Sequence, residues 1–283
     1  MWIWICGAAA IGGLLLRSAY ERKTLTTTEY EIETDKIERD RTFVFLSDLH
    51  DNCFGEGQRD LLEVIDKVKP DAVLIGGDMM VVKGHADIED ALFLVEQLAK
   101  RYPVYHGNGN HENRMDRDRG VYLDQYDRYT KRLHQLGVCH LSDSSAEIDG
   151  HIRIYGLNLD KQFYKKFHTE PLEMEYIVQK LGKPGDERFQ ILLAHSPLYR
   201  HVYAQWGADL TLCGHFHGGT IRIPGLGGLM TPQFQFFKDC CSGIFRENGK
   251  AMIVSRGLGT HSVNIRLNNK PELVVVRLKA RGK

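Results

Sequence analysis

Short apolar runs alternate with helical patterns along most of the chain. Five short runs are predominantly apolar, as expected of strands buried on both faces. They cover residues 42–46, 72–75, 103–105, 190–194 and 209–213. Between the runs, apolar residues recur at helical spacing. This spacing predicts helices over residues 58–69, 87–101 and 122–136.

Strand patterns dominate the later part of the chain. Residues 152–155, 251–254 and 273–276 are predicted strands, and the polar, β-branched residues 24–37 suit an edge strand or a linker. Strands that alternate with helices and then follow one another indicate an α/β protein. We expect two sheets packed face to face with helices outside.

The chain opens with an uncharged apolar run from Trp2 to Leu16. This is shorter than the ~20 residues that usually span a bilayer. No basic residue precedes the run, whereas a secretory signal has a basic amino terminus. Arg17, Arg22 and Lys23 follow it, which favours a single-pass anchor in the cell membrane with the main domain on the cytoplasmic face. The alternative is a main domain outside the cytoplasm, on an atypical signal anchor.

These patterns predict three segments. Residues 1–23 would form the membrane anchor, 24–40 a linker or edge strand, and 41–283 one domain of ordinary α/β length. Lys and Arg number 37, as do Asp and Glu, so the balanced charge does not indicate a nucleic-acid partner. The six cysteines form no disulfide framework, which fits a reducing compartment.

Polar motifs follow these five apolar runs. Ligands of open α/β sheets bind beyond the carboxyl ends of the strands, so these motifs can converge on one crevice. In extended chain, residues two apart point the same way, so a pair such as Asp48 and His50, or His215 and His217, could reach one ion. The candidate residues are Asp48, His50, Asp78, Asn110, His111, Glu112, His195, His215 and His217.

Oxygen and imidazole ligands of this kind suit manganese, iron, zinc or cobalt better than calcium. Two such ions about 3.5–4 Å apart are the apparatus of phosphoester hydrolysis. Any one of these histidines alone would more often be structural, and we assign that role to the histidines outside the motifs. His261 stays ambiguous, because its glycine-rich loop could face the site.

The ordered motifs D-x-H, GD, GNH[DE], H and GHxH resemble those of calcineurin-like metallophosphoesterases. The flanking residues 218–224 and 257–260 resemble the bacterial, membrane-anchored branch of that family. The resemblance implies a four-layer αββα sandwich of two mixed β-sheets flanked by helices. It also implies a hydrolase with two metal ions, in which a hydroxide that bridges the ions attacks phosphorus.

The resemblance also implies a role for each residue. Asp78 would bridge the ions, Asn110 would hold phosphate oxygens, and Glu112 would orient its neighbours. His111 would protonate the leaving oxygen or stabilise its developing charge. The first ion would take Asp48, His50 and His217, and the second Asn110, His195 and His215.

The substrate is open at this stage. A phosphodiester, a phosphomonoester or a pyrophosphate would suit the motifs, including one linked to a lipid. Residues 163–168 and 226–237 mix aromatic, basic and glycine residues, and could form a rim that meets the bilayer or an acyl chain. The preferred interpretation, however, is that both segments pack on the core. The alternative function is a non-catalytic membrane scaffold of the same fold that binds a protein partner.

Overall fold

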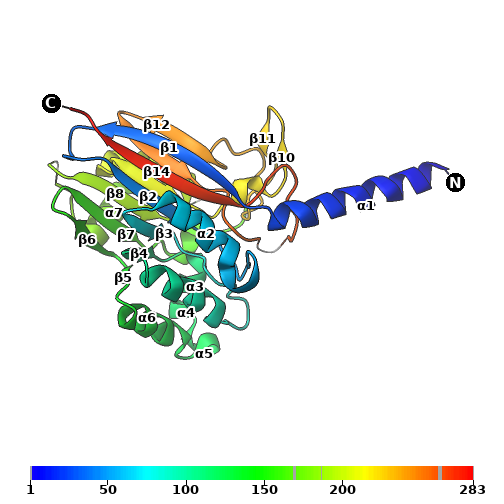
Figure 1. Ribbon diagram of the computed structural model, residues 1–283, viewed down its shortest axis with the longest axis horizontal. Helices are drawn as coiled ribbons and strands as arrows, with labels where there is room; N and C mark the ends of the chain where they lie inside the picture. The colour runs from blue at the N-terminus through cyan, green and yellow to red at the C-terminus, as the bar shows by residue number, and fades with distance from the viewer. Residues whose placement is uncertain (1, 168–169, 186, 261–262, 283) are drawn as a thin grey trace.

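The computed structural model describes residues 2–167, 170–185, 187–260 and 263–282. Two six-stranded mixed sheets form its centre (Figure 1). The first sheet has the order β1 (Thr26–Thr34), β14 (Glu272–Ala280), β2 (Arg41–Leu46), β3 (Ala72–Ile75), β4 (Val104–Gly107) and β5 (Cys139–Leu141). The second has the order β12 (Gly243–Glu247), β13 (Lys250–Val254), β9 (Leu210–Cys213), β8 (Phe189–Ala194), β7 (Ile152–Leu157) and β6 (Ser144–Ile148).

Each sheet contains a block of four parallel strands. In the first sheet these are β2, β3, β4 and β5, and in the second β13, β9, β8 and β7. Parallel strands end at the same edge of their sheet. The loops that follow β2, β3, β4, β8 and β9 therefore gather in one region of the molecule, as the motif spacing predicted.

Three apolar clusters define the layers. Alternate residues of β2 point to opposite faces: Phe43 packs between the two sheets, and Val44 packs under the helices of the first sheet. Tyr155 on β7 packs under the helices of the second sheet. The order of layers is therefore helix, sheet, sheet and helix, which confirms the α/β prediction.

The helices follow the same division. The first sheet is covered by α2 (Arg59–Val68), α3 (Glu89–Ala99), α4 (Asn110–Arg117) and α6 (Gln125–Gln135), with the short α5 (Arg119–Tyr122) beside them. The second is covered by α7 (Met174–Leu181) and α8 (Arg200–Trp206). Shorter elements are the hairpin β10 (Arg222–Ile223) and β11 (Gly227–Gly228), and the 3-10 turns η1 (Glu56–Gln58), η2 (Lys161–Tyr164), η3 (Pro197–Tyr199) and η4 (His217–Gly219).

Helix α1 (Trp2–Lys23) projects from the body of the molecule (Figure 1). Its outer part exposes large apolar side chains, among them Trp4 at 83% and Leu16 at 75%. Among the residues that the structure describes, no helix is long and apolar enough to cross a membrane. The predicted transmembrane anchor is therefore not supported.

The two segments considered for a rim are only partly exposed. Phe163 is buried against Tyr176 and Tyr199 beneath the helices of the second sheet, which confirms the preferred interpretation that this residue packs on the core and excludes it from a rim. Phe167 and Phe236 are exposed. His168, at the end of the first rim segment, lies outside the described residues.

Candidate metal centre

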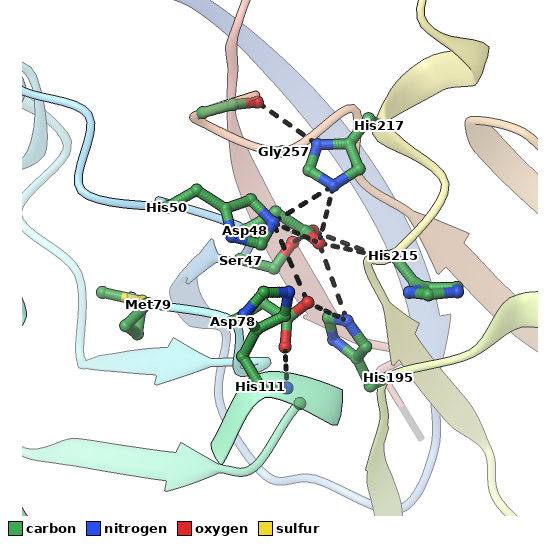
Figure 2. Close-up of polar contacts among 12 residues, drawn as sticks. Ser47, Asp48, His50, Asp78, Met79, His111, His195, His215, His217 and Gly257 are labelled. Carbon is green, nitrogen blue, oxygen red and sulfur yellow. Dashed lines mark hydrogen bonds and ion pairs between the residues drawn. The ribbon is translucent and has the colours of Figure 1, made fainter. Parts of the chain in front are cut away.

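The structure brings the predicted aspartate and histidine ligands together at the carboxyl ends of the strands (Figure 2), and Asn110 lines the same cleft. Asp48 and His50 follow β2, Asp78 follows β3, and His195 follows β8. All the candidate side chains are buried except that of Asn110, which is half-buried at the first position of α4. We call the seven predicted ligands the metal-ligand cluster: Asp48, His50, Asp78, Asn110, His195, His215 and His217.

Six of the seven residues form two adjacent groups, and Asn110 lines the cleft beside them. In the first group, the Nε2 atoms of His50 and His217 face each other at 3.2 Å. Asp48 Oδ1 lies 3.5 Å from His217 Nε2 and 3.9 Å from His50 Nε2. In the second group, the ligand atoms of Asp78, His195 and His215 all lie within 4.8 Å of one another. Each group could hold one ion.

Asp78 lies between the two groups. Its Oδ2 atom is 3.1 Å from His195 Nε2 and 3.8 Å from His50 Nε2. Its Oδ1 atom accepts a hydrogen bond of 2.8 Å from the backbone N–H of His111, which fixes the carboxylate. One carboxylate oxygen is thus within reach of both groups.

Backbone carbonyls orient two of the imidazoles. The Nδ1–H of His195 donates to Gly76 O at 2.8 Å, and that of His217 donates to Gly259 O at 3.2 Å. Because a carbonyl only accepts, the proton of each neutral ring lies on Nδ1. The Nε2 lone pair then points into the cluster, as a metal ligand requires.

His111 has the opposite tautomer. Its Nδ1 accepts a hydrogen bond of 2.7 Å from the backbone N–H of Val82, so the proton of the neutral ring lies on Nε2. The ring meets that of His50 edge to face, with centroids 4.9 Å apart. His111 can therefore present a hydrogen-bond donor to a group bound beside the cluster.

The ligand loops are not extended, and this part of the prediction was wrong. Asp48, His50, Asp78, His215 and His217 all have left-handed φ angles, between 47° and 68°. Non-glycine residues rarely adopt this conformation, and such strain collects at functional sites. Because the chain turns at both histidines, His215 and His217 point to different groups rather than to one ion.

Glycines let two of the loops touch. A Cβ atom on Gly77 would lie 1.9 Å from Gly109 N. Glu112, buried beneath both loops, accepts hydrogen bonds from the backbone N–H groups of Asp78, Met79 and Gly109 at 2.8–2.9 Å. Glu112 thus orients the loops that carry Asp78 and Asn110, as predicted for it.

The negative charges of the cluster and its unshared electron pairs suit the binding of cations. Burial alone would lower the pKa of His195, but the carboxylates of Asp78 and Asp48 raise it to about 10. These buried carboxylates thus attract positive charge. His215 Nε2 and Asn110 Oδ1 are buried without a hydrogen-bond partner. Buried polar atoms rarely stay unsatisfied, and coordination of a divalent ion would satisfy both.

The sequence did not reveal the support behind His217. Arg266 is fully buried and donates to the carbonyl oxygens of Gly257 and Gly259. Asn269 Nδ2 donates to His217 O at 2.7 Å. Both residues lie in an irregular segment without periodicity, so no sequence signal marked them. His261, the ambiguous histidine, lies outside the described residues.

Comparison with known proteins agrees with this geometry. The family model for calcineurin-like phosphoesterases matches residues 41–219, well over half of the chain. An uncharacterized metallophosphoesterase of Aquifex aeolicus is 27% identical, over 94% of this chain and 96% of its own. The phosphodiesterase YaeI of Escherichia coli is 26% identical over a match that covers 83% of this chain and 81% of YaeI. This chain therefore belongs to the calcineurin-like phosphoesterase family and is a hydrolase that acts on phosphoesters.

Proposed function

We propose that the chain hydrolyses its phosphoester with two divalent ions held by the metal-ligand cluster. Asp48, His50 and His217 would hold one ion, and Asn110, His195 and His215 the other; Asp78 would contact both. The ions would supply an acidified water as nucleophile and positive charge for the phosphate oxygens. The observation that carries this proposal is Asp78 Oδ2, which lies within 4 Å of an imidazole nitrogen in each group.

The chain's own residues would act on the leaving group. His111 Nε2–H is directed by the Val82 contact and would donate to the leaving oxygen as negative charge develops there. If Nδ1 were protonated, its N–H would face the N–H of Val82, and this hydrogen bond would be lost. This favours a neutral ring that stabilises charge, the second of the two roles that the resemblance implied. Asn110 would orient phosphate oxygens through its side-chain amide.

We propose that the substrate is a lipid-linked phosphoester and that α1 attaches the enzyme to a membrane. The exposed apolar residues support this: Trp2, Trp4, Ile11, Leu14, Leu15 and Leu16 on α1, and Leu226, Phe236 and Phe237 near the β10–β11 hairpin. Figure 1 shows this hairpin at the end of the body from which α1 projects. Arg17, Arg22 and Lys23 would favour the anionic cytoplasmic face.

The phosphoesterase proposal is tested by metal content and turnover. Full-length protein should contain about two transition-metal ions per chain and hydrolyse bis(p-nitrophenyl) phosphate. Chelation should abolish turnover, and Mn²⁺, Fe²⁺, Zn²⁺ or Co²⁺ should restore it. Protein that stays metal-free and inactive with all four ions would instead support the non-catalytic scaffold.

The membrane proposal needs separate measurements. Vesicles containing phosphatidylglycerol should bind the wild type, whereas the Leu14→Ser/Leu15→Ser variant should bind much more weakly and still hydrolyse the soluble diester. Protease added to sealed right-side-out cell vesicles should leave the main domain intact. Its digestion there would exclude the cytoplasmic face, and equal vesicle binding by the two proteins would exclude α1 as the attachment.

A further inference from the structure

The cleft above the metal-ligand cluster has a basic wall. The cleft measures about 440 Å³, and His50, Asp78, Asn110 and His111 line its floor. Asp118 is the one carboxylate in the remainder of its described lining. Against it stand six cationic residues, which we call the basic wall: Lys83, Arg114, Arg117, Lys161, Lys165 and Lys166. The whole chain has no net charge, so this excess is local.

Only part of this charge is neutralised by the protein. Arg117 forms two hydrogen bonds of 2.9 Å with Asp118, and Lys165 pairs with Glu170 at 2.7 Å. Arg114 instead donates to a backbone carbonyl, which positions its guanidinium without cancelling its charge.

The remaining lysines are available to a ligand. Lys83 and Lys161 make no side-chain hydrogen bond or ion pair within the described part of the chain, and Lys166 lies 4.9 Å above the ring of Phe234. The hydrogen bonds from Arg117 lower the pKa of Asp118, and the charges of Lys161 and Arg114 add to this effect. Cations from α4 and from η2 therefore face the same space, although they are far apart in sequence.

Such a wall is more than a single phosphoester requires. The scissile phosphate would be neutralised at the cluster, and a neutral sugar or alcohol would leave the wall's cations unmatched. Clefts lined by one sign of charge concentrate ligands of the opposite sign, and charge-assisted contacts to phosphate are strong. We propose that the basic wall is a subsite for a second phosphate group of the substrate. This inference rests on the proposed phosphoesterase function, and it narrows the substrate class to phosphoesters that carry at least two phosphates.

The test compares two substrates that share their scissile bond and leaving group. Thymidine 5′-(p-nitrophenyl phosphate) carries one phosphate, and its 3′-phosphorylated form carries two. Full-length enzyme should have a kcat/KM about tenfold higher for the second. The Lys83→Ala/Lys161→Ala variant should lose most of this ratio. The matched control is Lys67→Ala/Lys131→Ala, which removes two exposed lysines from α2 and α6 and should keep the wild-type ratio.

Binding keeps the test independent of turnover. Thymidine 3′,5′-bisphosphate should bind the wild type more tightly than thymidine 5′-monophosphate, and Lys83→Ala/Lys161→Ala should remove the difference. If neither substrate is hydrolysed but this difference persists, the phosphoesterase proposal fails and the subsite stands. Equal ratios in the wild type and the wall variant would overturn the subsite. So would a wall variant that loses only its binding to phosphatidylglycerol vesicles, since the wall would then serve lipid headgroups.

Discussion

The metal-ligand cluster and helix α1 are built on opposite principles. The cluster gathers seven polar side chains from five strand ends and buries six of them, whereas the outer part of α1 exposes apolar side chains from one continuous segment. Burial gives the cluster fixed geometry and strong electrostatics. Exposure leaves α1 free to meet another surface. The buried cluster thus provides the groups for the reaction, whereas the exposed side chains of α1 provide a surface for contact with other molecules.

The inner end of α1 connects the two regions. Ser18 and Glu21 are buried there. Ser18 Oγ accepts from Arg266 N at 3.0 Å, and Glu21 Oε2 accepts from Asn269 N at 2.9 Å. Asn269 in turn donates to the carbonyl oxygen of His217. The last turns of α1 are therefore part of the support of the cluster.

The largest effect is expected inside the cluster. Asp78→Asn keeps the size of the side chain but removes the negative charge that both groups share. Metal content should fall, and hydrolysis of bis(p-nitrophenyl) phosphate should fall more than about 10³-fold. Asp51→Asn is a nearby control, since Asp51 accepts a hydrogen bond from Val81 N and lies outside the cluster. An Asp78→Asn protein that retains both ions would contradict the shared position of this carboxylate.

A smaller loss of activity is expected when the metal ligands are kept and the hydrogen-bond donor His111 is removed. His111→Ala should retain both ions and slow the chemical step by ~10²–10⁴-fold, because no assigned metal contact is lost. Elemental analysis and single-turnover rates separate these outcomes. Loss of metal in this variant would show that His111 supports the cluster rather than the leaving group.

The connection to α1 should have a weaker influence. Glu21→Gln replaces a buried carboxylate that accepts from both Asn269 N and Arg17 Nε, and an amide oxygen with no charge holds these donors less well. We expect metal affinity to fall about tenfold, as for outer groups that orient ligands. Glu63→Gln, on the exposed side of α2, is the matched control. Unchanged affinity in titrations with Mn²⁺ would show that α1 does not act on the cluster.

The contrast between the two regions also explains what could be predicted from the sequence. The cluster was predictable because each motif directly follows an apolar run, so local pattern and strand order place it. The left-handed turns at Asp48 and His215 were not, since they depend on contacts between loops. The support from Arg266 and Asn269 was missed for the same reason: it consists of contacts between irregular segments, such as the bond from Asn269 to His217 O. Residues 163–168 were left with two interpretations because an aromatic residue in a polar segment gives no sign of its burial; Phe163 is buried and Phe167 is exposed.

The smallest effect concerns a buried histidine outside the cluster. His106 on β4 is fully buried and contacts the hydroxyl of Tyr129 at 2.8 Å. Burial, together with the neighbouring His140, lowers its pKa to about 3, the reverse of the shift at His195. Carboxylates near the ring make the difference between the two histidines.

This difference gives a pH dependence of stability. Below pH 6.5 the unfolded chain takes up a proton at His106 that the folded protein does not, so the free energy of unfolding falls as pH falls from about 6.5 toward 3. The slope from this group is at most about 1.4 kcal/mol per pH unit. His106→Gln should still bond to Tyr129 but lose this slope. The free energies of unfolding of the wild type and the variant, measured in urea on chelator-treated proteins at pH 7, 6 and 5, should therefore approach each other as the pH falls. An equal pH dependence in the two proteins would show that folded His106 takes up its proton as readily as the unfolded chain. Burial without a nearby carboxylate would then not lower the pKa of His106.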